Sequence, residues 1–178
     1  MVEKITSLVP YAVLLSHFLF IFIVFTLIFK NSWGRDMTNW FGKKATVLAL
    51  IISLGAVLGS LFYSEIVGFE PCILCWWQRI FLFPLPVILI VSLWKNDSAV
   101  FKYIVPLAIL GTIVALYHSY FELGGVSLLP CTAEGGACSR VYVKEFGYIT
   151  IPTMSLTSFA FVLIISWFKK QYDKNNNA

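Results

Sequence analysis

Charge is scarce in this sequence. Only 12% of the 178 residues carry a charged side chain, whereas 59% are hydrophobic and the mean hydropathy is +0.83. A soluble domain of this length could not bury so much apolar surface, which excludes a water-soluble globular fold. The chain also lacks an obvious internal repeat, and its only low-complexity segment is 174–178. These absences leave a single domain whose natural solvent is a lipid bilayer.

Uncharged runs fill most of the chain, and a membrane-spanning helix needs about 20 mostly apolar residues. The sequence predicts five spans, at residues 11–29, 45–63, 75–94, 103–121 and 148–168. The third span reaches membrane thickness only if it includes 75–79, which brings Arg79 near a membrane surface. The first run is too long, and ends in residues too bulky, for a cleaved secretory signal, so we interpret it as a retained helix.

The basic residues are distributed unevenly between the two sides of these spans. One side holds nine: Lys30, Arg35, Lys43, Lys44, Lys95, Lys102, Lys169, Lys170 and Lys174. The other side holds four: Lys4, Arg79, Arg140 and Lys144. Because loops rich in Lys and Arg stay in the cytoplasm, the sequence predicts an external N-terminus and a cytoplasmic C-terminus. All four cysteines then fall on the outer side, where disulfides persist. The net charge of +4 is therefore a topology signal and requires no nucleic-acid partner.

A Cys-x-x-Cys motif, Cys72-Ile73-Leu74-Cys75, follows the second predicted span. Two thiols at this spacing can close a small disulfide ring, and a helix that begins here should lower the pKa of the first thiol. Pro71 suits the first turn of such a helix. Since a thiolate is the attacking species in disulfide exchange, the motif indicates a redox site. A structural disulfide and half of a four-cysteine zinc site are the alternatives.

The second cysteine pair, Cys131 and Cys138, lies in a glycine-rich loop between the fourth and fifth spans. Six residues separate these thiols, a wider spacing than in most thiolate zinc sites, so we predict no metal. A structural staple is the simplest interpretation of this pair alone. However, exposed disulfides tend to be the labile ones. Two pairs on one side of the membrane permit a relay, in which one pair meets a soluble protein and the other a membrane cofactor.

Residues near the Cys-x-x-Cys motif are candidates for binding that cofactor. Arg79 follows Cys75 by four residues, so the two share a helix face, and a charge near the hydrocarbon is a functional candidate. Its guanidinium could stabilise a quinone anion, or it could extend to lipid headgroups. Trp76 could flank the cofactor or belong to the interfacial aromatic belt. His118 could supply a hydrogen bond or a proton, or be an ordinary helix-end residue. His17 has no neighbouring motif and is interpreted as a packing residue.

The order of these features resembles the DsbB/BdbC family of quinone-linked disulfide oxidases. The matching residues are Pro71, Cys72, Leu74, Cys75, Gln78, Arg79, Cys131, Cys138 and the segment Ile151-Pro152-Thr153-Met154-Ser155-Leu156. The resemblance implies an all-α integral membrane protein with a four-helix transmembrane bundle at 45–170. It adds an N-terminal transmembrane helix and cytoplasmic loop at 1–44, and a disordered cytoplasmic tail at 171–178. The expected location is the bacterial inner membrane.

The resemblance also implies an activity. A reduced DsbA-like periplasmic thioredoxin-fold protein would attack the loop disulfide at Cys131, and Cys138 would then exchange with Cys72. Cys75 would be left as the thiolate that reacts with a quinone, either ubiquinone or menaquinone. Arg79, His118 and Trp76 are the expected quinone-binding residues. The chain would thus be a protein-disulfide oxidoreductase in an electron transport path that supports disulfide bond formation.

Two alternatives and two departures accompany this expectation. A quinone reductase similar to vitamin K epoxide reductase would use the same residue types, but in that family the loop cysteines precede the Cys-x-x-Cys motif. A non-enzymatic membrane protein with structural disulfides would tolerate the loss of Arg79. The helix at 11–29 precedes the four helices usual in the resembling family, and the interval from Cys131 to Cys138 is short. Both departures bear on the choice of partner.

Overall fold

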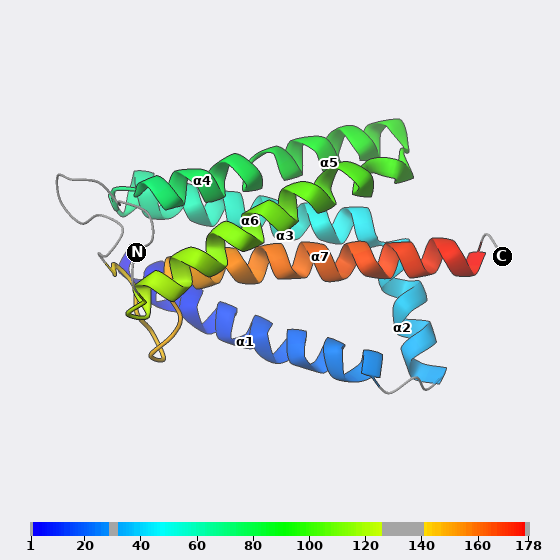
Figure 1. Cartoon of the computed structure of the whole chain (residues 1–178), viewed down its shortest axis with the longest axis horizontal. Helices are drawn as coiled ribbons and strands as arrows, with labels where there is room; N and C mark the ends of the chain where they lie inside the picture. Colours follow the sequence, from blue (N-terminus) through cyan, green and yellow to red (C-terminus); the bar gives the residue numbers. More distant parts are fainter. Residues whose placement is uncertain (1, 29–31, 126–140, 177–178) are drawn as a thin grey trace.

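The computed structural model describes residues 2–28, 32–125 and 141–176 (Figure 1). Its α-helices are α1 (Val2–Ile28), α2 (Ser32–Lys43), α3 (Ala45–Leu61), α4 (Ile73–Leu82), α5 (Pro84–Lys95), α6 (Phe101–Glu122) and α7 (Ile151–Asn176). A π-helical turn, Phe62–Ile66, continues α3, and a short 3-10 turn, Ser98–Val100, precedes α6. In the described segments the only β-structure is an isolated bridge between Glu145 and Ile149.

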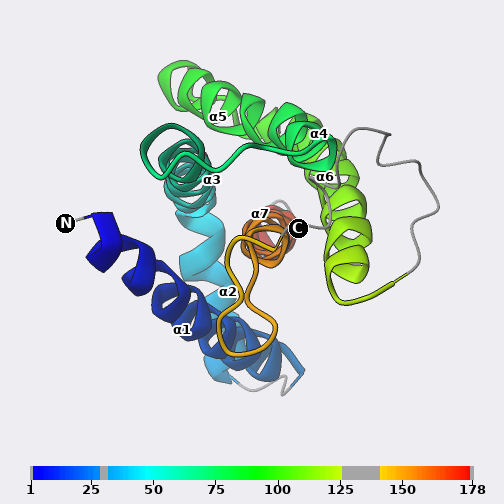
Figure 2. The same ribbon diagram turned by 90° about the vertical axis from the view of Figure 1, so that its left-hand side faces the viewer.

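The bundle is organised around α7. Figure 2 looks along the helices and shows α7 in the middle, with α1, α3, α4 and α6 arranged around it. Among the described residues, five helical segments are long and apolar enough to cross a membrane, and α4 and α5 together form one of them. The two chain termini lie at opposite ends of the bundle, as five crossings require (Figure 1). The predicted fold class, an all-α membrane protein with a four-helix bundle and an additional N-terminal helix, is confirmed.

The third span bends between α4 and α5. Phe83 still donates its backbone N–H to the Arg79 carbonyl at 2.9 Å, but Pro84 has no N–H to continue the ladder. Proline is well suited to the first turn of the new helix, so α5 begins at Pro84 without a connecting loop. The helix then ends at Asn96, whose left-handed backbone (φ 51°) caps it.

The interior of the bundle is packed with small and aliphatic side chains, while large apolar side chains point outward. Phe159 of α7 is fully buried, and its ring fills the space beside Gly111 of α6. Ile51, Val87 and Ile113, on three different helices, are all exposed on the outer surface. An apolar exterior around a close-packed core is the arrangement expected of helices that face lipid.

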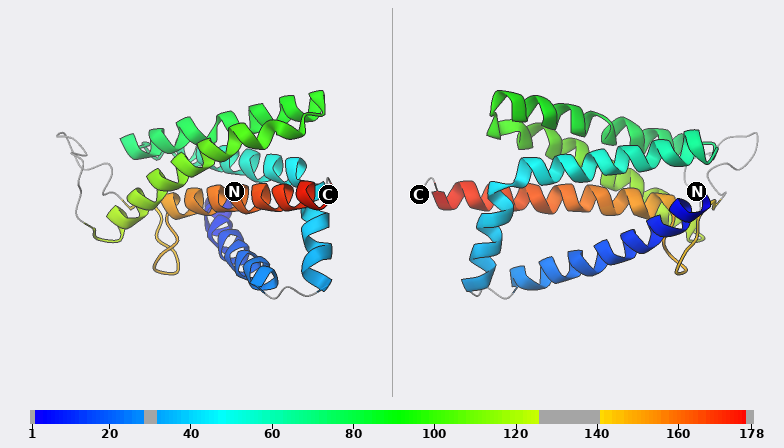
Figure 3. Two further views of the ribbon diagram at one scale, coloured as in Figure 1. Left: turned by 45° about the vertical axis from the view of Figure 1, so that its right-hand side comes forward. Right: turned by 180° about the vertical axis from the view of Figure 1, so that it is seen from behind.

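The loop expected after the first span is instead a helix, α2, which runs across the end of the bundle (Figure 3). Phe41 of α2 stacks on Phe168 of α7 with ring centroids 5.1 Å apart, and Gly42 packs against Tyr172 so closely that no side chain fits there. α2 is amphipathic, with polar and apolar residues on different faces, as in helices that lie in a membrane interface. The expectation of a loop was wrong because packing against α7 stabilises a segment too polar to span.

The expected disordered tail is also helical as far as Asn176. Lys169 pairs with Asp173 one turn later, with Nζ 2.6 Å from Oδ1. Asn176 donates from Nδ2 to the Tyr172 carbonyl at 2.8 Å. These local contacts and the packing of Tyr172 on α2 extend α7 well beyond the apolar run, so the prediction of disorder was wrong for 171–176.

The contact between Gly111 and Phe159 gives a stability prediction. A methyl group at position 111 would overlap the buried ring, and overpacking of this kind costs about 1–3 kcal/mol. Gly111→Ala should therefore lower the thermal unfolding midpoint in detergent. Gly55→Ala is the matched control, because its added Cβ meets nothing within 4 Å. Equal midpoints for the two variants would contradict the packing described for α6 and α7.

Candidate redox site and cavity

The Cys-x-x-Cys motif lies at the start of α4, at the same end of the bundle as the N-terminus of α1. Gly68, with φ of +81°, allows the chain to turn back after the π-helical turn, and the extended residue Cys72 then becomes the N-cap of α4. Its Sγ accepts a hydrogen bond from the Cys75 backbone N–H at 3.3 Å. The two sulfur atoms are 3.0 Å apart, within hydrogen-bond distance and without a disulfide between them.

The hydrogen bond between the two thiols is the largest influence on the pKa of Cys72. The Cys75 contact and burial together raise the pKa of Cys72 from 9.0 to about 12, while His118 acts weakly in the opposite direction. Cys72 is only 5% exposed, which explains the burial effect. The sequence-based expectation of a lowered pKa for this first thiol was therefore wrong, because these two effects outweigh the N-terminus of α4. When the reduced pair loses one proton, the remaining proton is therefore on Cys72.

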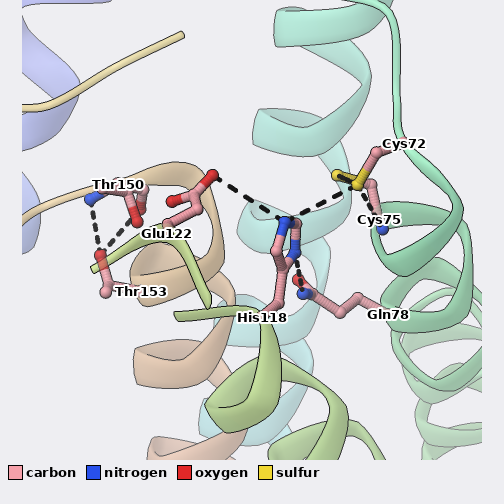
Figure 4. Close-up of polar contacts among 7 residues, drawn as sticks. All are labelled: Cys72, Cys75, Gln78, His118, Glu122, Thr150 and Thr153. Atoms are coloured by element: carbon pink, nitrogen blue, oxygen red, sulfur yellow. Dashed lines mark hydrogen bonds and ion pairs between the residues drawn. The ribbon is translucent and has the colours of Figure 1, made fainter. Parts of the chain in front are cut away.

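His118 lies beside Cys72, deep in the bundle. Its Nε2 is 3.7 Å from the Cys72 sulfur, and its Nδ1 is 3.0 Å from Nε2 of Gln78 (Figure 4). With the Gln78 amide nitrogen placed toward Nδ1, that ring nitrogen accepts, and the imidazole proton is on Nε2, facing the sulfur. The structure thus brings His118 to the cysteine pair, and Gln78, a residue without a predicted role, orients its ring.

Glu122 extends this cluster by one helical turn. Its Oε1 is 3.9 Å from Nε2 of His118, and its side chain is only 6% exposed (Figure 4). The other carboxyl oxygen has no hydrogen-bond partner among the described residues. Sequence reasoning missed Glu122, although its spacing of four residues from His118 on one helix was a usable signal.

Arg79, one helical turn after Cys75 on α4, is also buried. It donates from Nε to the Ser60 hydroxyl at 3.0 Å and from Nη2 to the Ser60 carbonyl at 3.1 Å. The guanidinium lies 5.2 Å from the ring of Trp76 and 5.9 Å from that of Phe83. In the described part of the chain no carboxylate is within ion-pair distance of Arg79. A buried guanidinium held only by neutral groups retains its positive charge for another binding partner.

A cavity of about 240 Å³ joins these groups. Its polar lining includes Ser60, Tyr63, Ser64, Glu70, Cys72, Cys75, Gln78, Arg79, His118, Glu122 and Ser155, and its apolar lining includes Val9, Val13, Gly55, Ala56, Leu82 and Met154. Along α3 and the π-helical turn that continues it, the lining changes from glycine and alanine at 55–56 to polar side chains at 60–64. The cavity therefore suits a molecule with a polar ring and an apolar chain. Trp76 is not part of the lining and is 54% exposed.

Glycines widen this cavity. Gly55 and Gly59 have the Gly-x-x-x-Gly spacing that often brings two membrane helices together. Here a side-chain carbon added at either position would meet nothing within 4 Å, so these glycines do not mediate a helix contact. Both line the cavity, and their missing side chains provide part of its volume.

Tyr63 is a site residue that sequence reasoning did not find. It lies in the π-helical turn, a distortion frequent at functional sites, and is only 5% exposed. Its ring stacks on Phe69 at 5.9 Å, and Phe69 stacks on Tyr142 at 4.6 Å. Within the described segments its hydroxyl has no hydrogen-bond partner, although it lines the cavity. A buried hydroxyl without a partner indicates a missing ligand or water.

The cluster also contains donor atoms suited to a metal. The sulfur atoms of Cys72 and Cys75 and one ring nitrogen of His118 lie within 4.8 Å of one another. Thiolate and imidazole ligands could hold a thiophilic ion such as Zn²⁺, which usually takes a fourth ligand.

The second predicted pair, Cys131 and Cys138, lies outside the described residues.

Cys72 and Cys75 line a cavity inside a bundle of membrane helices. This arrangement indicates a membrane protein that carries out thiol–disulfide exchange. Comparison with known sequences specifies the class further. The sequence model of the family described as disulfide bond formation protein DsbB matches residues 42–168, and the chain belongs to this family. α1 lies outside the matched residues. No solved structure matches the chain significantly.

Several curated relatives support this membership. The chain is 39% identical over 126 residues to the SPbeta prophage-derived disulfide bond formation protein B of Bacillus subtilis, covering 71% of this chain and 85% of that protein. It is 42% identical over 117 residues to disulfide bond formation protein C of the same organism, covering 64% and 83%. The probable disulfide formation protein of Chlamydia pneumoniae is 38% identical over 137 residues, covering 76% and 98%. The chain is thus a multi-pass membrane protein of disulfide bond formation.

The raised pKa of Cys72 predicts unequal labelling of the two thiols. An ordinary thiol with a pKa of 9.0 is mostly thiolate at about pH 10, whereas Cys72, with a pKa of about 12, stays protonated and unreactive there. Iodoacetamide should therefore modify Cys75 before Cys72 in the reduced native protein at about pH 8 and at about pH 10. Peptide mass spectrometry measures both rates, with denatured protein as the control. Equal rates in the native protein would rule out this placement of the proton.

Proposed function

We propose that this protein is a thiol:quinone oxidoreductase, which reoxidises a DsbA-like thioredoxin-fold protein and transfers two electrons to a membrane quinone. One observation carries the proposal. Cys75 lines a cavity that also contains the buried guanidinium of Arg79 and the hydroxyl of Tyr63. Among the described residues, no carboxylate pairs with Arg79, and the Tyr63 hydroxyl has no hydrogen-bond partner. Hydrogen-bond donors held ready in a dry site are what stabilises a developing oxyanion.

The cavity residues fit a quinone in polarity and in shape. Arg79 and Tyr63 are donors suited to the oxygen atoms of the ring, and Gly55 and Gly59 leave space for apolar atoms. A bound quinone supplies the acceptor for two electrons and two protons. Ubiquinone and menaquinone both have a ring with two oxygens and an isoprenoid chain, so the lining suits either.

The cysteines would act in a fixed order in this proposal. A thiolate of Cys138 would attack Cys72 of the oxidised Cys72–Cys75 pair, forming one disulfide while the other breaks, and Cys75 would leave as a thiolate. The electron pair would thus arrive on the sulfur that lies one helical turn from Arg79. Cys131 would receive the electrons of the DsbA-like partner.

His118 and Glu122 provide a route for protons. The Nε2–H of His118 faces the Cys72 sulfur, and the Glu122 carboxyl lies on the other side of the same nitrogen (Figure 4). In this tautomer Nε2 is a donor, so His118 would act as the acid toward a Cys72 thiolate, and Glu122 would return a proton to the same nitrogen. We assign His118 to proton transfer at Cys72, a role the sequence had suggested only toward the cofactor.

Two further features support the direction and the side of the reaction. The relatives are named for disulfide formation, which favours oxidation of a partner over a reductase similar to vitamin K epoxide reductase. Lys43 ends α2 and Lys95 ends α5, and these helix ends lie at the opposite end of the bundle from the start of α4 (Figure 1). By the positive-inside rule we place that end in the cytoplasm and the cysteines in the periplasm of the bacterial inner membrane.

Anaerobic quinone reduction tests the proposal directly. The purified protein in detergent, given a reduced DsbA-type protein, should reduce a ubiquinone or menaquinone analogue. Cys75→Ser and Cys131→Ser should each stop turnover, because each breaks one pair of the relay. If the native protein leaves every donor and quinone combination unreacted, the oxidoreductase proposal fails and a protein with structural disulfides is favoured.

Replacement of Arg79 should separate the two half-reactions. Arg79→Ala should raise the quinone KM about 10- to 150-fold, corresponding to about 1.5–3 kcal/mol for a hydrogen bond to a charged group. The KM for the DsbA-type protein should change far less. Arg79→Lys keeps the charge but loses the planar guanidinium that holds Ser60. Its quinone KM should therefore lie between those of the native protein and Arg79→Ala. An equal loss in both half-reactions would remove Arg79 from the quinone site.

Tyr63→Phe tests the unpartnered hydroxyl. The change removes one oxygen and keeps the stacking on Phe69, so we expect the quinone KM to rise about two- to twelvefold, from about 0.5–1.5 kcal/mol for one hydrogen bond. Tyr103→Phe is the control, because Tyr103 is exposed on α6 and does not line the cavity. An unchanged quinone KM in Tyr63→Phe would show that the hydroxyl does not contact the ring.

A further inference from the structure

The N-terminal helix α1 lies outside the family-matched residues, but its middle part contacts α7 and the segment that precedes α7. Near its outer end, Tyr11 makes an edge-to-face contact with Phe146 at 5.2 Å. Further along, Phe20 makes a similar contact with Phe161 at 5.3 Å. Ile23 is buried in the same cluster as Phe161. The helix is therefore an integral part of the bundle.

A directional chain of hydrogen bonds fixes the middle of α1. Thr157 donates its hydroxyl hydrogen to the Thr153 carbonyl at 2.8 Å, so its oxygen is free to accept from Nε2 of His17 at 2.7 Å. The other ring nitrogen of His17 then accepts from the Tyr148 hydroxyl at 3.3 Å. Each donor meets an acceptor, which is the arrangement that makes a polar side chain tolerable within a span. His17 is thus a latch between α1, α7 and the segment that leads into α7.

The same face of α1 forms part of the cavity wall. Val13 and Val9 lie one and two turns before His17, on the face that the latch turns inward, and both line the cavity. Across the cavity from them is the glycine face of α3, where no side chain reaches out. Leu15 of α1 is by contrast 71% exposed on the lipid side. Val9 and Val13 are therefore half-buried residues on the cavity face of a helix whose other face is exposed to lipid.

We propose that α1 is part of the quinone site: Val9 and Val13 contact the isoprenoid chain where it leaves the cavity, and the His17 latch holds this wall in place. The inference rests on the proposed function and assigns a role to the helix that the family match does not include. The occupant follows from the lining, because an aliphatic wall opposite two glycines offers no hydrogen bond and suits only an apolar chain. The contribution of α1 to quinone binding should then increase with the length of the isoprenoid chain.

Tail length and a matched pair of substitutions test the wall. Val13→Trp fills the cavity exit, whereas Leu15→Trp places the same side chain on the lipid face of the same helix. With a long-chain quinone, Val13→Trp should raise the KM at least tenfold; with an analogue that has one isoprenoid unit, the change should be under threefold. Leu15→Trp should leave both values unchanged. His17→Ala should reproduce the long-chain effect in weaker form.

A binding readout separates failure of this inference from failure of the oxidoreductase proposal. A quinone analogue with a photoreactive azide on its chain should crosslink to the α1 peptide of the native protein, and Val13→Trp should abolish this product. Disulfide exchange with the DsbA-type protein, and a single size-exclusion peak, show that the variants are folded. If native protein reduces quinone but the label reaches only α3 and α7, and Val13→Trp changes neither KM, the role of α1 is refuted while the function stands. If no quinone is reduced or crosslinked, both proposals fall.

Discussion

The interior of a bilayer offers no water to polar groups, and this constraint shapes most of the contacts within the bundle. Arg79 is tolerated inside because Ser60 accepts two of its hydrogen bonds, one through its hydroxyl and one through its carbonyl. Gln78 satisfies one nitrogen of His118. His17, far from the cysteines, is satisfied by Tyr148 and Thr157. In each case the partner comes from a different helix or segment, so meeting the polar requirement also fixes how these elements pack.

The exceptions to this pairing are concentrated at the cavity. Five buried side-chain atoms lack a hydrogen-bond partner among the described residues, and three of them belong to Tyr63, Glu122 and Ser155, which all line it. Unpaired polar atoms are costly in a medium of low dielectric constant, and their clustering around one space indicates that something polar enters that space. Arg79 contributes a buried positive charge to the same wall. The energetic argument for a ligand thus comes from residues on α4, α6, α7 and the π-helical turn after α3.

Local irregularities of the backbone build the mouth of this site. The π-helical turn at Phe62–Ile66 presents Tyr63 to the cavity, and Gly68 allows the reversal that brings Cys72 to the start of α4. Pro84 bends the third span below the site, where the bundle core is packed tightly. Regular helix over these stretches would bury the cysteines in a closed core or carry them past it. The regular helices supply the rigid frame, and the irregular turns place the chemistry within it.

The sequence alone determined what depends on local composition and spacing. Span positions follow from the length of the apolar runs, and the common face of Cys75 and Arg79 follows from helical periodicity. Tertiary packing decided the rest. Whether Trp76 faces lipid, whether Gly59 faces a neighbour or a cavity, and whether Tyr63 finds a partner depend on how helices are rotated against one another. The helical state of α2 and of 171–176 likewise depends on their contact with each other, between residues more than a hundred positions apart. The amphipathic pattern of α2 does not name the partner that it packs against, and for that reason only the three-dimensional structure could show these contacts.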